Sequence, residues 1–223
     1  MAKVGFINGS FTVLELVVDP QATLDSAIQF SESTSMTPLK WRIGNFQTDD
    51  SFRISQGDVL GTDDALIVTP SRAILLPDQP AFQVYNDTVV PNVTGDATNF
   101  IITFNTVDYD VGAGFVDPDY TAPEDGIYLF SASIVLSGID SGHTAGQLYM
   151  KSSTGETQYG VRLNPFAMSD SGNLAIEANG MFRLAQGDSV ALTLQVSNGT
   201  KTVNVFGAAL TAEPSSFQGF LLG

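Results

Sequence analysis

Four aspartates stand close together in two short triplets of the chain. Asp108 and Asp110 form an Asp-Tyr-Asp triplet, and Asp117 and Asp119 form an Asp-Pro-Asp triplet. Hard cations such as Ca²⁺ take six to eight oxygen ligands, and aspartates clustered on turns supply them. The spacing therefore suggests a calcium site formed by these four carboxylates. The alternative is that they are solvated turn residues.

The single histidine, His143, is the other residue type that could do chemistry. It lies in a polar, glycine- and serine-rich segment, residues 137–146, and the chain has no cysteine. A Cys–His pair is therefore excluded, and a Ser-His-Asp triad would need this one histidine as its base. No Gly-x-Ser-x-Gly, His-Glu-x-x-His, EF-hand or phosphate-loop pattern occurs. We expect a non-enzymatic protein in which His143 is an exposed loop residue. A pair of carboxylates for glycoside cleavage comes together only in the folded chain, so the sequence leaves a glycan hydrolase as an alternative.

Composition excludes several classes of partner. The chain of 223 residues has 24 acidic and 9 basic residues, for a net charge of -15. Such a chain repels nucleic acid. The absence of cysteine excludes disulfides and thiolate metal sites. No apolar run approaches the roughly 20 residues that span a membrane, and the N-terminus does not match a signal peptide, so we expect no membrane insertion.

The stretch from residue 120 to residue 136 organises the C-terminal part of the chain. Asp125-Gly126 is a turn signal, and an extended segment follows it. Its side chains alternate between an apolar face and a mixed face, which is typical of a strand in a sandwich. The apolar face consists of Tyr128, Phe130, Ala132, Ile134 and Leu136.

Short apolar runs continue to the end of the chain without a competing helical pattern. From residue 81 onward about ten of them are separated by Gly, Asn, Asp or Pro. This pattern predicts an all-β domain, a ten-stranded jelly roll. The runs lie near residues 82–86, 100–105, 119–122, 127–137, 146–152, 157–163, 173–183, 188–197, 202–210 and 216–221.

Several motifs resemble those of C1q-like domains, the trimeric heads of the C1q and tumour-necrosis-factor superfamily. Residues 120–130, Tyr-Thr-Ala-Pro-Glu-Asp-Gly-Ile-Tyr-Leu-Phe, resemble the signature strand of that family. Four further segments resemble motifs of the family and follow one another in the same order: residues 81–82, 102–110, 184–190 and 216–221. The segment 112–119, which precedes the signature strand, is longer than in the family. The resemblance implies a C1q/TNF-like homotrimeric head over residues 80–223. Some such heads hold calcium near the trimer axis, which favours the aspartate site.

The resemblance also indicates where a receptor would bind. It implies that both ends of the head lie together and that the loops at the far end face outward. Residues 137–146 and 164–172 are the best candidates, because they are long, polar and rich in Gly or Ser. We expect these loops to tolerate change without loss of fold. Their candidate receptor contacts are Asp140, His143, Thr144, Phe166 and Asp170.

The pattern of residues 21–79 predicts a short β-rich stalk. Their short strands would bury little in one chain, whereas three copies together would bury a shared apolar seam. Trp-Arg-Ile-Gly at 41–44, Ser-Phe-Arg-Ile at 51–54 and the segment 60–68 resemble bacteriophage tail-fibre shafts. We expect Trp41, Ile43, Phe52 and Ile54 to contribute to the seam. In residues 1–20, Asn8-Gly9 between apolar runs predicts an attachment hairpin, which packs on its own trimer or docks on another protein.

These patterns lead to one functional expectation and two alternatives. The leading one is a non-enzymatic trimeric virion protein of a bacteriophage, a fibre, appendage or capsid-decoration protein. Its head would bind a host-surface glycan or protein, and residues 1–20 would contact other virion proteins. The first alternative is a secreted or surface C1q-like lectin or adhesin. The second is a fibre-borne glycan hydrolase.

Overall fold

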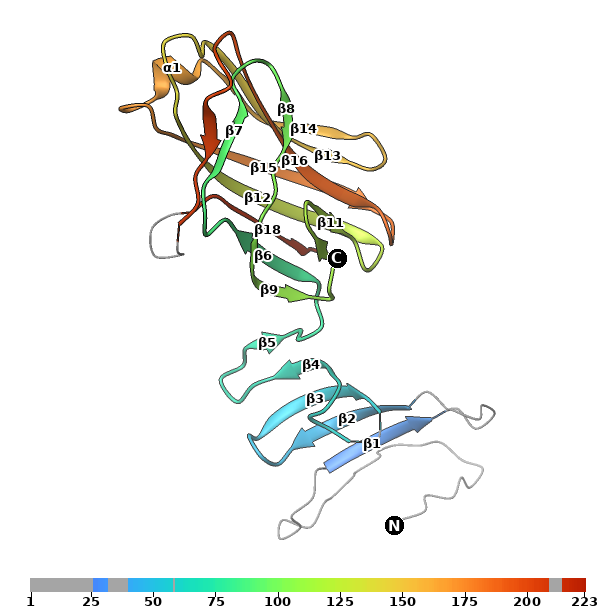
Figure 1. Ribbon diagram of the computed structural model, residues 1–223. Helices are drawn as coiled ribbons and strands as arrows, with labels where there is room; N and C mark the ends of the chain where they lie inside the picture. The colour runs from blue at the N-terminus through green and yellow to red at the C-terminus, as the bar shows by residue number, and fades with distance from the viewer. Residues whose placement is uncertain (1–25, 32–39, 58, 209–213) are drawn as a thin grey trace, which may run out of the picture. The chain divides into compact units, whose positions relative to one another are not determined.

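The computed structural model describes residues 26–31, 40–57, 59–208 and 214–223 (Figure 1). The chain divides into two compact units, Met1–Pro77 and Asp78–Gly223. Strands dominate both units, and in the described ranges no helix is long and apolar enough to cross a membrane. The hairpin expected at residues 1–20 lies outside the described residues.

The first unit contains one five-stranded antiparallel sheet, here called the N-terminal sheet. Its strands follow one another in chain order. In its register Ile43 lies opposite Ile54, and Asn45 lies opposite Phe52. Directly paired residues share a face, so Trp41, Ile43, Phe52 and Ile54 lie on the same face. The strands are β1 (Ser26–Ser31), β2 (Lys40–Phe46), β3 (Ser51–Gln56), β4 (Asp64–Val68) and β5 (Ile74–Leu75).

The opposite face of the N-terminal sheet is closed over a buried arginine. Arg53 is only 8% exposed, and its guanidinium forms an ion pair with the equally buried Asp64. It also contacts Asp49 at 2.6 Å, donates to the Ser51 hydroxyl at 2.7 Å and lies 4.1 Å from the centre of the Phe46 ring. A buried charge needs such partners. The polar side of this sheet is therefore the closed one, and the apolar side, where Phe52 is 38% exposed, is the open one.

The second unit, here called the head, is a jelly roll of two antiparallel sheets. The first has the order β7-β17-β12-β18-β6-β9, with β15 also paired to β12. The second has the order β10-β11-β16-β13-β14, with β8 paired to β16. The elements are β6 (Ala81–Tyr85), β7 (Val90–Thr94), β8 (Asn99–Ile101), β9 (Thr106–Val111), β10 (Phe115–Val116), β11 (Asp119–Thr121), β12 (Gly126–Ser137), β13 (Ala145–Ser152), β14 (Thr157–Leu163), α1 (Pro165–Met168), β15 (Leu174–Leu184), β16 (Ser189–Ser197), β17 (Val203–Val205) and β18 (Ser216–Leu221).

The expected all-β jelly roll is confirmed, but the expected number of strands is wrong. The described part of the head has thirteen strands, against ten predicted. The three additional ones are β7, β9 and β10. β7 contains Pro91 and Asn92, β9 contains Asp108 and Asp110, and β10 is only two residues long. β7 and β10 lack the apolar alternation by which a strand is recognised in a sequence. β9 does alternate, with Val107, Tyr109 and Val111 at every second position, but its aspartates suggest turn or metal-binding residues instead.

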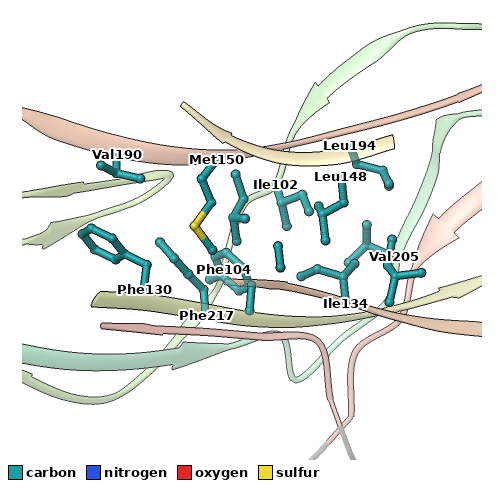
Figure 2. Packing of buried hydrophobic residues seen from close by; sticks show 14 of the residues in the cluster. Ile102, Phe104, Phe130, Ile134, Leu148, Met150, Val190, Leu194, Val205 and Phe217 are labelled. Atoms are coloured by element: carbon teal, nitrogen blue, oxygen red, sulfur yellow. The ribbon is translucent and has the colours of Figure 1, made fainter. Parts of the chain in front are cut away.

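The core lies between the two sheets, and β12 contributes its whole expected apolar face (Figure 2). Tyr128, Phe130, Ala132, Ile134 and Leu136 are all at most 2% exposed. Figure 2 shows Phe130 and Phe217 from one sheet below Met150 and Leu148 from the other. Burying aromatic side chains of this size gives the largest single contribution to stability in such a domain.

Candidate binding site

The two ends of the head segment lie together. The Leu221 amide donates to the Pro80 carbonyl at 2.9 Å, and the Ile127 amide donates to the Gly223 carbonyl at 3.0 Å. From there β12 leads to the opposite end of the head, where α1 also lies (Figure 1). We call that end, made of residues 138–144, 164–173 and 198–202, the loop end.

His143 is not an exposed loop residue, which corrects the expectation from the sequence. Its side chain is fully buried. The backbone N–H of Asp140 donates to Nδ1 at 2.9 Å, so Nε2 carries the proton and donates to the Thr200 carbonyl at 2.8 Å. Both ring nitrogens of the neutral side chain are therefore satisfied. His143 is unavailable to a receptor and holds the loop end together instead.

Two glycines make room for this histidine. A Cβ on Gly199 would lie 2.5 Å from the ring, and a Cβ on Gly95 would lie 2.7 Å from Nε2 and 1.9 Å from the Thr200 carbonyl oxygen. Gly95 also has a φ of +129°, which L side chains rarely adopt. His143 thus ties its own loop to two segments that are distant in the sequence. For the same reason we expect His143 to be an exception to the tolerance of change predicted for this loop.

The structure brings the two predicted loops into contact. The Phe166 amide donates to the His143 carbonyl at 3.0 Å, and the Ile139 amide donates to the Gly172 carbonyl at 3.1 Å. Of the five predicted receptor contacts, four are exposed at the loop end: Asp140, Thr144, Phe166 and Asp170. These four side chains are accessible to a partner, and His143 is the exception.

The four aspartates of the expected calcium site do not converge. Asp110 accepts hydrogen bonds from the backbone N–H groups of Gly114 and Phe115, at 3.1 and 3.0 Å. Asp117 accepts one from the Phe104 amide at 2.7 Å. Across the described ranges there is no group of three or more His, Cys, Asp or Glu side chains that could hold a metal ion. A calcium site within one chain is therefore not formed. Asp110 caps the turn that follows β9, and Asp117 is hydrogen-bonded to the backbone of Phe104.

A polar groove of about 320 Å³ opens beside the loop end, on the outer face of β13, β14 and β16. Gln147 lies opposite Arg162 on one side and Gln195 on the other, so three polar side chains stand in one row. Sequence reasoning missed this row, because polar residues at outward positions of strands are ordinary. The groove is lined by Ala145, Gly146, Gln147, Arg162, Leu163, Gln195 and Ser197.

The outer face of the other sheet is uncharged at its centre. None of the residues of β6, β18 and β12 is charged. Phe220 lies opposite Leu129, which lies opposite Met181, so an apolar row crosses three neighbouring strands. Phe220 and Met181 are 44% and 56% exposed. We call this surface the uncharged face; a groove of about 390 Å³ lies on it, lined by Tyr109, Leu129, Ser131, Asn179, Gln218, Gly219 and Phe220.

Comparison with known proteins finds similarity in fold only. No protein-family model matches the chain, and no curated protein matches it. Among solved structures, the globular domain of zebrafish complement 1qA protein is 19% identical, with a TM-score of 0.46, over 65% of this chain and 98% of that one. Murine APRIL at pH 8.0 is 12% identical, with a TM-score of 0.45, and the match covers 65% of this chain and 99% of that one. Such values say nothing about what this chain binds.

Proposed function

We propose that this protein is a non-enzymatic, homotrimeric fibre, appendage or decoration protein of a bacteriophage virion. In this proposal the head presents its loop end to a glycan or protein on the host surface. Residues 1–20 attach the other end to the particle. The observation on which the trimer depends is the uncharged face of the head.

Electrostatics favours that face as the contact between copies. Each chain has a net charge of -15, so two copies repel each other over most of their surface. Strands β6, β18 and β12 contain no carboxylate. Phe220 of β18, Leu129 of β12 and Met181 of β15 form an apolar row across the sheet. Contiguous exposed apolar surface marks an interaction site. A contact centred on β6, β18 and β12 therefore joins identical acidic chains through strands that carry no carboxylate.

The N-terminal sheet supports the same assembly. Its open face carries Trp41, Ile43, Phe52 and Ile54 beside the polar Asn45 and Gln56, while its closed face holds the buried Arg53 and Asp64. Copies packed through the open faces would bury the seam that one chain leaves partly exposed. The virion role itself depends on the resemblance of residues 41–44, 51–54 and 60–68 to phage tail-fibre shafts.

The position of the loop end supports a binding role for the head. Pro80 and Leu221 lie at one end, so a particle attached through the N-terminal part of the chain would leave the loop end free. Glycoside hydrolysis needs two carboxyl groups on either side of the bond. Neither of the two grooves described above is lined by an Asp or Glu. Binding without catalysis is the function that this arrangement supports best.

Light scattering on the purified chain tests the trimer. We expect a mass three times that of the 23.7 kDa chain, and loss of that mass in Phe220→Asp, which places a carboxylate on the uncharged face. Val116→Asp is the matched control, because Val116 is 68% exposed on β10, in the other sheet. A monomer mass for the unmodified chain at micromolar concentration would contradict the trimer.

Attachment to host cells tests the binding role. Fluorescently labelled protein should bind intact host cells, and Phe166→Ala, which truncates a half-exposed aromatic side chain at the loop end, should weaken that binding.

Antibody labelling in negative-stain micrographs tests the virion role: the antibody should label phage particles. Labelling of the bacterial envelope with no labelling of particles would favour the adhesin alternative.

A further inference from the structure

The groove on β13, β14 and β16 has hydrogen-bonding groups held in fixed positions. Gln147 Nε2 donates to Gln195 Oε1 at 3.1 Å, and Gln195 Nε2 donates to the Ala97 carbonyl at 3.0 Å. These bonds orient both amides in one row with Arg162. Each amide nitrogen keeps a second N–H, and the hydroxyl of Ser197 completes the polar lining. Fixed donors lose little entropy when a ligand binds.

The sign of the charge in this groove is opposite to that of the chain. Arg162 is the only charged residue of its lining, in a protein with 24 acidic and 9 basic residues. The head contains only four basic residues: Lys151, Arg162, Arg183 and Lys201. A single cation in a concave site attracts anions that the remaining surface repels. A guanidinium also matches the planar geometry of a carboxylate.

The dimensions and position of the groove further limit which ligands can fit it. A volume of about 320 Å³ is at the small end of the roughly 300–1,000 Å³ that ligand sites occupy. It is thus suited to one sugar residue. Ala145 and Leu163 add apolar contact beside the polar row. Ala145 pairs with Ser197, and the residues just beyond the two strands, Thr144 and Asn198, bond to each other at 3.0 Å. The groove therefore borders the loop end.

We propose that this groove binds a carboxylate-bearing sugar residue, a hexuronic acid, within a surface glycan. Arg162 pairs with the carboxylate, and Gln147, Gln195 and Ser197 exchange hydrogen bonds with the hydroxyl groups. The inference deepens the proposed function and rests on it, since it names the class of glycan that a groove next to the outward-facing loop end recognises.

Titration of the full-length chain with methyl β-D-glucuronide, followed by saturation-transfer NMR, tests the groove. Methyl β-D-glucoside, in which a hydroxymethyl group replaces the carboxylate, should bind at least about tenfold more weakly, because it forms no charge-assisted bond with the guanidinium. Arg162→Gln should reduce glucuronide binding to the level of the glucoside. Lys151→Gln removes the same charge at an exposed position of β13 outside the groove and should leave binding unchanged. Calorimetry of both variants checks that the head stays folded.

Two results would overturn the assignment. One is equal affinity for the two glycosides, or no binding of either. The other is an equal loss in Arg162→Gln and Lys151→Gln, which would reflect net charge alone. The proposed function is judged separately, by binding of the unmodified chain to host cells: a chain that binds cells but not the glucuronide overturns the groove and leaves the function standing.

Discussion

At the scale of single residues, His143 shows how a polar side chain becomes part of the structure. Its two ring nitrogens join the Asp140 amide to the Thr200 carbonyl, and Gly95 and Gly199 leave the space for its ring. A buried polar group with both partners in place costs little, whereas removing it leaves the partners unsatisfied. The histidine therefore positions the loop end without touching a ligand.

His143→Ala should lower the free energy of unfolding of the head by about 2–4 kcal/mol. The loss combines a cavity with one unpaired backbone N–H and one unpaired carbonyl. Calorimetry of the full-length protein measures it, and Thr144→Ala, at the exposed neighbouring position, should change the transition by less than about 0.5 kcal/mol. A melting temperature unchanged in His143→Ala would contradict the structural role.

Asp64 in the N-terminal sheet gives a second prediction, on acid stability. Burial by itself raises its pKa, but hydrogen bonds from Ser55, Gly61 and Arg53, together with the charge of Arg53, outweigh burial and lower the pKa below its usual range. A carboxylate with a lowered pKa stabilises the folded state above the pKa of the unfolded chain, and that contribution is lost as the pH falls through the folded pKa.

The N-terminal sheet should therefore lose stability below about pH 4. Trp41 is the only tryptophan, so its fluorescence follows this unit. Unfolding midpoints between pH 3 and 7 are the measurement. Asp64→Asn should be less stable at neutral pH and should show a smaller change on acidification. An identical acid profile in the variant would refute the role of this pair.

At the scale of elements, each sheet has one face that a single chain leaves open. In the N-terminal sheet the polar side is closed over Arg53, and the apolar side with Phe52 is open. In the head, β12 is buried on its aromatic side and borders the uncharged face on the other. Strands with apolar residues on both faces are typical of sheets covered on both sides. Both observations point to association through these faces.

Phe52→Ala tests the N-terminal face. Replacing a fully buried phenylalanine by alanine lowers the free energy of unfolding by about 3–5 kcal/mol. The loss is smaller if part of the Phe52 side chain stays exposed in the assembly. The transition followed by Trp41 fluorescence should shift to lower temperature. All six tyrosines lie in the head, so tyrosine absorbance should show that the head still melts where it did. A Trp41 transition that does not move would show that Phe52 is outside the seam.

At the scale of the whole molecule, net charge and association oppose each other. In the proposed trimer each added copy brings a further charge of -15, and the uncharged face is the apolar contact proposed to overcome this repulsion. Salt shortens the Debye length from about 10 Å at 0.1 M to about 3 Å at 1 M and so weakens repulsion between copies. The assembly should depend on salt even though its contact is apolar.

Sedimentation at increasing dilution, in low and in high NaCl, measures that dependence. The trimer should persist to lower protein concentration in high salt, because salt screens the repulsion between the negatively charged copies. A contact made of ion pairs between copies would respond in the opposite sense. Dissociation by salt would therefore refute assembly through the uncharged face.

The sequence alone determined the features that depend on local periodicity. Alternation from Tyr128 to Leu136 predicted β12 and its buried face, because successive side chains of a strand point to opposite sides. The same reasoning identified the all-β jelly roll and two of the loops at the loop end. It missed β7 and β10, because proline or shortness hides the alternation in those strands. It also missed β9, whose alternating Val107, Tyr109 and Val111 stand beside aspartates that suggest turn residues.

Only the tertiary structure decided which distant residues meet. His143 is buried because Thr200, Gly95 and Gly199 surround it, and no local pattern reports those contacts. The groove of Gln147, Arg162 and Gln195 exists because three strands pair in one register. The aspartates near residue 110 stay apart because Asp110 bonds to the backbone N–H groups of Gly114 and Phe115, whereas Asp117 bonds to that of Phe104. Spacing in the sequence limits which atoms can meet, but strand pairing over many residues determines which of them do.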